Sequence, residues 1–146
     1  MSEAPELISI TPDTLTDYPG LSCFMNPEQE GTKIRMGWIR ERFSEGLAIR
    51  ILAVPDTRKT VGYIEYIPGE YAWRAVDAEG CLFIHCIWVY PKQMRELGNA
   101  SRLVRACIDD ARQAGKPGVA VITSEGPFMA GKDLFLKSGF SLVQEE

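Results

Sequence analysis

The spacing of hydrophobic and polar residues divides the chain into short strands and longer amphipathic helices. Segments in which apolar residues alternate with polar ones, or run continuously for a few positions, are typical of strands. Apolar residues three and four positions apart indicate helices instead. The predicted strands cover 7–10, 47–54, 60–67, 82–89, 118–123 and 140–143, and the predicted helices cover 13–18, 32–45, 100–111 and 128–137.

Two of these helices have well-defined apolar faces. The face of 32–45 consists of Ile34, Trp38, Ile39 and Phe43, and Gly46 then supplies a C-terminal stop. The face of 100–111 consists of Ala100, Leu103, Val104, Cys107, Ile108 and Ala111. Strands 47–54 and 60–67 should pair as a hairpin, because residues 55–59 between them have turn chemistry.

Composition narrows the class of protein. A length of 146 residues, 45% of them hydrophobic, suits one domain over 1–146 with a sizeable core. The net charge of −4 argues against a nucleic-acid partner. Neither a membrane span nor a signal peptide is recognisable, so we expect a cytoplasmic protein without a membrane partner. Four cysteines without a Cys-x-x-Cys pair and a single histidine leave zinc patterns unfilled, so we expect no metal.

The most specific chemistry lies at the start of helix 100–111. Residues 95–100 read Arg-Glu-Leu-Gly-Asn-Ala and join strand 82–89 to that helix. Small residues such as Gly98 and Ala100 let a diphosphate approach several backbone N–H groups, and the positive end of the helix dipole favours the anion. The segment therefore predicts a pyrophosphate-binding loop.

Here the sequence resembles the GNAT superfamily of N-acetyltransferases. Arg95-x-x-Gly98-x-Ala100 matches the family's Arg/Gln-x-x-Gly-x-Gly/Ala signature, and residues 134–140 look like its Phe-Tyr-x-x-x-Gly-Phe segment. The resemblance implies an α/β fold with a mixed, twisted sheet flanked by helices, and acetyl-coenzyme A as cosubstrate. The seventh strand of such domains is missing here, so we expect the sheet edge either to be completed by a partner subunit, as in a homodimer, or to stay short.

The resemblance also implies where the coenzyme is bound. The main chain of Ile87, Trp88 and Val89 would meet the thioester and the pantetheine arm. The loop formed by Arg95, Glu96, Leu97, Gly98, Asn99 and Ala100 would hold the pyrophosphate. Phe135 takes the place of the family's frequent acid, a tyrosine, and would lie beside the coenzyme sulfur. Because phenylalanine has no proton to donate, the thiolate must take a proton from water or another group, or leave as an anion.

Transfer to an amine also needs a base, and the central strands offer candidates. Glu65 is the first, acting directly or through water, since acidic residues on these strands serve as bases in many GNAT enzymes. His85 is the second, because imidazole exchanges protons near neutral pH. Cys86 could instead carry the acyl group or line the acceptor pocket. Strand alternation predicts that His85 and Cys86 point to opposite faces, so that only one of them lies on any given face. The alternatives are an outward-facing strand carboxylate for Glu65, a packed or hydrogen-bonded side chain for His85, and a buried apolar residue for Cys86.

Aromatic residues from the end of the hairpin onward, before strand 82–89, are candidates for the acceptor pocket. Tyr66, Tyr71 and Trp73 could hold an amine or a planar substrate, although core packing competes as an explanation. The sequence thus predicts an enzyme that moves an acetyl group from acetyl-coenzyme A to a small-molecule or peptide amine. The alternative is a coenzyme-A-binding sensor or interaction module with little catalysis. A redox protein using Cys81 or Cys86 is a weaker third reading.

Overall fold

Five strands form one mixed sheet in the computed structural model, which describes residues 4–14, 30–71, 80–90, 98–122 and 132–141. The strands lie side by side in chain order: β1 Glu6–Ile10, β2 Ala48–Ala53, β3 Thr60–Pro68, β4 Leu82–Val89 and β5 Val119–Val121. Each of the first four is antiparallel to its neighbour, and β4 and β5 are parallel. A parallel pair needs a crossover connection, and helix α3 provides it.

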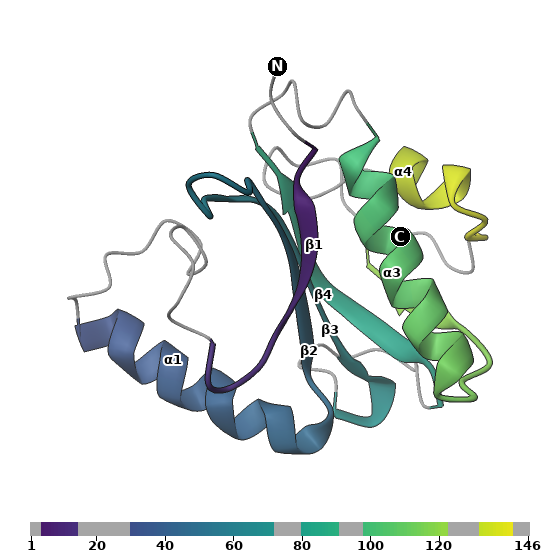
Figure 1. The fold of residues 1–146 in the computed structure, drawn as a ribbon. Coiled ribbons are helices and arrows are strands. Elements are labelled where there is room, and N and C mark those ends of the chain that lie inside the picture. The colour runs from purple at the N-terminus through teal and green to yellow at the C-terminus, as the bar shows by residue number, and fades with distance from the viewer. Residues whose placement is uncertain (1–3, 15–29, 72–79, 91–97, 123–131, 142–146) are drawn as a thin grey trace.

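Helices cover both faces of this sheet (Figure 1). Helix α1 Glu30–Arg42, followed by the short helix η1 Phe43–Glu45, lies on one face, which we call the α1 face. Helices α3 Asn99–Gln113 and α4 Lys132–Lys137 lie on the other, which we call the α3 face. A further short helix, η2 Gly69–Tyr71, follows β3 directly.

The core has two parts, one on each face, because strand side chains alternate between the faces. The part on the α1 face includes Ile39, Ile49, Ile51, Tyr63 and Ile67. The part on the α3 face includes Leu52, Ile64, Tyr66, Leu103, Val104, Cys107 and Phe135. Strand β3 contributes to both parts and is buried along almost its whole length. The face on which a β3 side chain lies therefore determines which part of the core it contacts.

Most of the predicted elements are confirmed. Strand β4 has the predicted bounds, the hairpin of β2 and β3 is present, and the helix predicted over 32–45 is formed by α1 and η1. Gly46 ends that helix with a φ of 98°, in the left-handed region that favours glycine. The predicted apolar face of α3 is also confirmed, since Leu103, Val104, Cys107 and Ala111 are buried.

The differences concern the ends of the chain and of β5. Strand β5 is only Val119–Val121, shorter than the predicted 118–123. Phe140 and Ser141, predicted to begin a last strand, are not in a strand, and the rest of that segment is outside the described residues. Most of the predicted helix over 13–18 is outside them as well. The prediction that the sheet edge lacks a seventh strand therefore remains untested by the described residues.

Candidate functional site

The first turn of α3 has the features of an anion-binding site. Gly98 precedes the helix with a φ of 79°, and its carbonyl accepts a hydrogen bond from the N–H of Arg102 at 3.1 Å. Glycine has no side chain to cap the following N–H groups, and no acidic residue lies in the first turn. Among the described residues, no heavy atom lies within 4 Å of where a Gly98 Cβ would be, so none of them blocks an approach from this side. Arg95, Glu96 and Leu97 lie outside the described residues.

Strand β4 ends beside this helix, and its pairing changes along its length. Only Leu82, Phe83 and Ile84 pair with β5 among the described residues. The second half of β4, which contains Ile87, Trp88 and Val89, pairs with β3 on its other edge. Over these residues, β4 is hydrogen-bonded to β3 along one edge. No described strand pairs with its other edge, the one that faces β5 further back along the strand.

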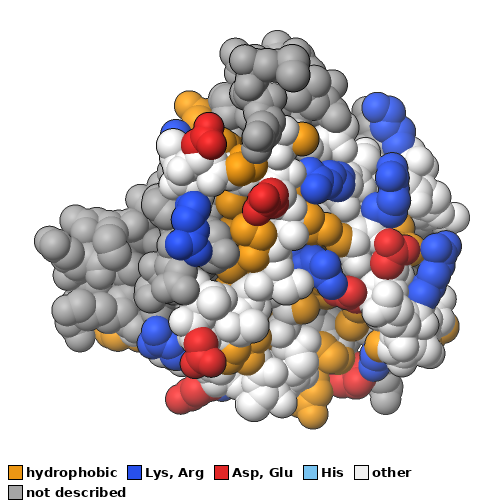
Figure 2. Space-filling view, viewed as in Figure 1, with side chains coloured by type: hydrophobic (Ala, Val, Ile, Leu, Met, Phe, Trp, Pro, Cys, Tyr) orange, Lys and Arg blue, Asp and Glu red, His pale blue; other side chains and the backbone are white. Residues whose placement is uncertain are grey.

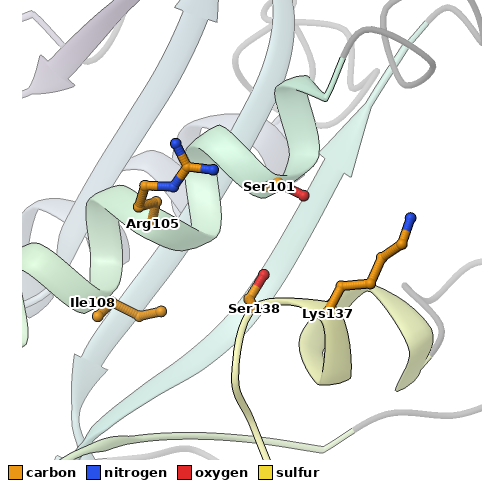
Figure 3. A pocket seen from close by; sticks show the side chains of 5 residues that line it. All are labelled: Ser101, Arg105, Ile108, Lys137 and Ser138. Atoms are coloured by element: carbon orange, nitrogen blue, oxygen red, sulfur yellow. The ribbon is translucent and has the colours of Figure 1, made fainter.

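A pocket of about 250 Å³ lies between α3 and α4. It is lined by Ser101, Arg105, Ile108, Lys137 and Ser138. Figure 3 shows that the two serine hydroxyls point into the space between the helices, and Ser101 belongs to the first turn of α3. Figure 2 shows lysine and arginine side chains gathered over this side of the molecule. Two cations and two hydroxyls next to a helix start are suited to a phosphorylated ligand.

A second polar cluster lies on the α1 face, within the core. The Tyr63 hydroxyl donates a hydrogen bond of 2.6 Å to Oε1 of Glu65. The other carboxylate oxygen, Oε2, lies 3.4 Å from Nδ1 of His85 on β4. The side chains of Glu65 and His85 are only 2% and 5% exposed. A buried carboxyl group needs polar partners in place of water, and the Tyr63 hydroxyl is such a partner for Oε1. The contact between Oε2 and Nδ1 of His85 does not have the geometry of a hydrogen bond.

Aromatic rings hold this cluster in place. Trp88 stacks on Tyr63 with ring centroids 5.9 Å apart and planes 6° from parallel. Phe83 meets His85 edge to face, with centroids 5.4 Å apart. Such ring pairs add roughly 0.5–1.5 kcal/mol beyond their burial and restrict the rotation of the rings they join. The rings of Tyr63 and His85 are thus held by Trp88 and Phe83, two residues of β4, the strand predicted to contact the coenzyme.

The prediction that only one of His85 and Cys86 lies on a given face of the sheet is wrong. Pairing between β3 and β4 shifts by one residue between Glu65 and Tyr66, so that Glu65 lies opposite Cys86, Tyr66 lies opposite Ile84, and His85 is the additional residue. A β-bulge of this kind interrupts the alternation of side chains. His85 consequently reaches Glu65, while Cys86 packs against the same α1-face core.

The remaining predicted site residues are spread over the fold. Tyr66 lies on the α3 face and is buried, so its position gives no support to a role in acceptor binding beside Glu65. Tyr71 in η2 is 50% exposed, and Trp73 is outside the described residues. Phe135 is buried against the α3-face core, with its ring edge on Phe140 at 5.3 Å between centroids. Asn99 is buried, and Ala100 is half-buried.

Tyr66 belongs instead to a polar network that joins the sheet to α3. Its hydroxyl donates to Oδ2 of Asp110, and Arg50 on β2 donates to both oxygens of the same carboxylate at 3.2 and 2.8 Å. Burial, reinforced by the hydrogen bond and the charge of Asp110, raises the pKa of Tyr66 well above its ordinary value. Burial likewise raises the pKa of the neighbouring Cys107 thiol. Both groups therefore stay protonated at neutral pH.

Sequence reasoning missed Tyr63, Lys137 and Ser138. Tyr63 could have been found, since a residue two positions before Glu65 on a strand shares its face. Lys137 and Ser138 lie in the predicted Phe-Tyr-like segment, but the pocket exists only because α4 packs beside α3. Nothing in the local sequence indicates that contact.

Neither a metal-binding cluster nor a membrane-spanning helix is found among the described residues. Within them, no three His, Cys, Asp or Glu side chains come together in a way that could hold a metal ion. No helix in this part of the chain is both long enough and apolar enough to cross a bilayer.

Comparison with known proteins gives consistent matches. The model of the acetyltransferase (GNAT) family matches residues 13–140. A curated relative, the N-acetyltransferase YoaP of Bacillus subtilis (strain 168), is 31% identical over 142 residues, which are 94% of this chain and 54% of that relative. The chain thus spans about half the length of this relative.

Solved structures match the fold. The aminoglycoside antibiotic 6'-N-acetyltransferase AAC(6')-Ih from Acinetobacter baumannii has a TM-score of 0.71 at 18% identity, over 97% of this chain and 93% of that one. AAC(6')-Iy, in complex with the bisubstrate analogue CoA-S-monomethyl-acetylneamine, has a TM-score of 0.72 at 16% identity, over 99% and 95% of the two chains. Because the family model covers most of the chain and the fold agrees with it, the chain belongs to the GNAT family of acetyltransferases.

Proposed function

We propose that the protein transfers an acetyl group from acetyl-coenzyme A to a primary amine. The observation that carries this proposal is the junction of β4 and α3 in a chain of the GNAT family. Among the described residues, the second half of β4 pairs with β3 alone. The chain then leads to the start of α3, which is preceded by Gly98 with its positive φ. Such a junction can hold a thioester along the strand and a diphosphate at the helix.

The coenzyme would be held by main chain at one end and side chains at the other. The N–H groups that follow Gly98 would bind the pyrophosphate, with Arg95 to Leu97 completing the loop. The α3–α4 pocket begins at Ser101, so the phosphorylated adenosine end would fill it. Arg105 and Lys137 would supply positive charge to the 3'-phosphate. Ile87, Trp88 and Val89 would lie along the pantetheine arm.

We place the acceptor amine on the α1 face, because the buried carboxylate and imidazole lie there. Two of the structurally similar proteins are aminoglycoside acetyltransferases, which favours a small-molecule amine as acceptor. Such amines are cations at neutral pH and need a base before they can attack. Glu65 and His85 form the group that would take this proton.

The reaction requires little else from the protein. The amine nitrogen attacks the thioester carbonyl carbon, the C–N bond forms, and collapse of the tetrahedral intermediate breaks the C–S bond with the electron pair going to sulfur. Holding the two reactants together can supply about 7–11 kcal/mol of the barrier reduction. Phe135 cannot protonate the departing thiolate. A thiol pKa of about 8.5 makes the thiolate a tolerable leaving group near neutral pH.

The coenzyme site is tested with two substitutions of nearly equal shape at Gly98. Asparagine tolerates the left-handed φ of 79°, and aspartate adds a negative charge in the same volume. We expect Gly98→Asp to weaken acetyl-coenzyme A binding at least tenfold more than Gly98→Asn, as measured by calorimetry, because the carboxylate repels the pyrophosphate. Equal affinities of the two folded variants would contradict the assignment.

The adenosine end is tested by comparing two coenzymes. Arg105→Gln and Lys137→Gln should weaken binding of acetyl-coenzyme A but have little effect on binding of its 3'-dephospho form. Equal losses for both forms would place the 3'-phosphate elsewhere.

Catalysis is tested by measuring release of coenzyme A thiol with a panel of amines. The panel should include aminoglycosides, amino sugars, polyamines and peptides with a free amino terminus. Transfer to at least one class supports the proposal, and we expect the small amines to be the better acceptors. Tight coenzyme binding without transfer to any amine would favour a coenzyme sensor instead.

A further inference from the structure

The start of α3 lies close against the sheet where β4 ends. Gly62 on β3 pairs with Val89, the last residue of β4. A Cβ at Gly62 would lie only 3.3 Å from Cδ1 of Leu103, which is fully buried near the start of α3. The distance between the end of β4 and the N–H groups that follow Gly98 therefore depends on how this first part of α3 packs on the sheet.

Arg102 makes a directional contact at this place. Its Nη1 donates a hydrogen bond of 2.6 Å to the carbonyl oxygen of Pro5, 97 positions earlier in the chain. Pro5 is buried and immediately precedes β1, and Figure 1 shows that β1 and α3 begin at the same end of the sheet. Apolar packing has no preferred direction, whereas a hydrogen bond from a charged donor has one and is stronger than a neutral hydrogen bond. The contact therefore fixes the first turn of α3 relative to β1.

The stability of the helix by itself does not explain this arginine. A cation in the first turn of a helix is unfavourable, because the helix dipole is positive there. The backbone N–H of Arg102 donates to the carbonyl of Gly98 at 3.1 Å, and this hydrogen bond closes the first turn. The residue that closes the turn is thus also the one whose side chain ties the turn to the sheet. Such a position suits a helix start that binds an anion.

We infer that Arg102 is a positioning residue of the coenzyme site, which holds the first turn of α3 against Pro5 so that the N–H groups of the turn face the diphosphate. This inference rests on the proposed function. Arg102 acts through the backbone of the turn and does not itself contact the coenzyme. Because the contact orders the turn before the coenzyme binds, less ordering is needed on binding and the affinity is higher. Coupling between two sites is reciprocal, so acetyl-coenzyme A should in turn hold β1 more firmly in the sheet.

The affinity for acetyl-coenzyme A tests the effect on binding. Arg102→Met keeps an apolar stem of similar length but removes every N–H donor of the side chain. We expect this variant to bind acetyl-coenzyme A about 10-fold more weakly, as measured by calorimetry. Arg112→Met is the matched control, since it removes the same charge from the last turn of α3, where Arg112 is exposed and 3.8 Å from Asp109. The affinity of this control should change less than about twofold, because salt screens a charge so far from the helix start.

Hydrogen exchange of the β1 amides, followed by mass spectrometry, tests the contact with Pro5. Without coenzyme, Arg102→Met should speed exchange in the peptide that contains β1 at least about threefold, and Arg112→Met should leave it unchanged. In the wild-type protein, saturating acetyl-coenzyme A should slow exchange in the same peptide. In Arg102→Met, a concentration of coenzyme that saturates the variant should have no such effect. The wild-type measurement needs no substitution, so it tests the coupling even where a variant fails to fold.

Three results would overturn the inference while the proposed function stands. Weaker coenzyme binding by Arg102→Met with unchanged β1 exchange would mean that Arg102 contacts the coenzyme directly. Faster β1 exchange with unchanged affinity would mean that the contact supports the fold alone. A wild-type protein in which acetyl-coenzyme A protects the start of α3 but not β1 would show that the two are not coupled. The proposed function itself fails if the wild-type protein does not bind acetyl-coenzyme A.

Discussion

The two faces of strand β3 carry similar groups in different surroundings. On the α1 face, Tyr63 donates to the carboxylate of Glu65, whose second oxygen faces His85. On the α3 face, Tyr66 donates to the carboxylate of Asp110, which also binds Arg50. The phenol and the carboxylate are common to both clusters, and the third member differs.

This third member decides what each cluster can do. A guanidinium keeps its proton at any physiological pH, so the α3-face cluster is a fixed ion pair that joins β2 and β3 to α3. In the α1-face cluster the third member is the imidazole of His85, which the proposed function uses together with Glu65. Under the proposed function, the α3-face cluster serves stability and the α1-face cluster serves chemistry. Substitutions that separate these two roles test the proposal.

The largest expected effect is on stability, at Asp110. Asp110→Ala leaves Arg50 and the Tyr66 hydroxyl without their shared partner at the interface of the sheet and α3. We expect the free energy of unfolding to fall by about 3 kcal/mol, measured by urea denaturation, with kcat of the folded protein changed less than twofold. Asp109→Ala is the control on the same helix, since its ion pair with Arg112 is exposed and 3.8 Å long, and a change below about 0.5 kcal/mol is expected. Equal losses at the two positions would contradict the comparison.

A smaller effect is expected from crowding the α3 face at Gly62. A Cβ there would lie 3.0 Å from Cδ1 of Leu52 and 3.3 Å from Cδ1 of Leu103, so α3 approaches β3 closely only because the side chain is absent. Gly62→Val should therefore destabilise the protein by about 2 kcal/mol in the same assay. In the part of the chain that the structure describes, Gly37 in α1 has no such neighbour within 4 Å, and Gly37→Ala should be neutral or stabilise the helix by up to about 1 kcal/mol. A Gly62→Val variant as stable as the wild type would show that the contact can relax.

The smallest effect is expected for Tyr66→Phe, about 1 kcal/mol for one hydrogen bond at neutral pH. The way in which the free energy of unfolding depends on pH is more informative. The pKa of Tyr66 is raised from 10.0 in the folded state, so above that pH the unfolded chain loses the proton first and stability falls as the pH rises. Cys107, whose pKa is raised from 9.0, acts in the same direction from a slightly lower pH.

Urea denaturation between pH 8 and pH 11, under reducing conditions, should therefore show a shallower decline for Tyr66→Phe than for the wild-type protein. Parallel declines would mean that Tyr66 ionises equally easily in both states. In that event the α3-face cluster would not hold the phenol as tightly as its contacts indicate.

The sequence predicted the features that depend on neighbouring residues. The 3/4 spacing of Leu103, Val104 and Cys107 predicted the buried face of α3, and the run from Leu82 to Val89 predicted β4 with the right bounds. The Gly98 and Ala100 pattern pointed to the family that the family model then showed. These features follow from backbone geometry and periodicity, which a local segment carries by itself.

Only the tertiary structure decided which polar groups meet. Asp110 and Tyr66 are separated by 44 residues, and Asp110 and Arg50 by 60, yet one carboxylate binds both. Simple alternation allowed only one of His85 and Cys86 on a given face, whereas the bulge between β3 and β4 places both on the α1 face. A bulge arises from the pairing of two strands, and a hydrogen bond between distant elements arises from how they pack, so neither can be read from the residues of one segment.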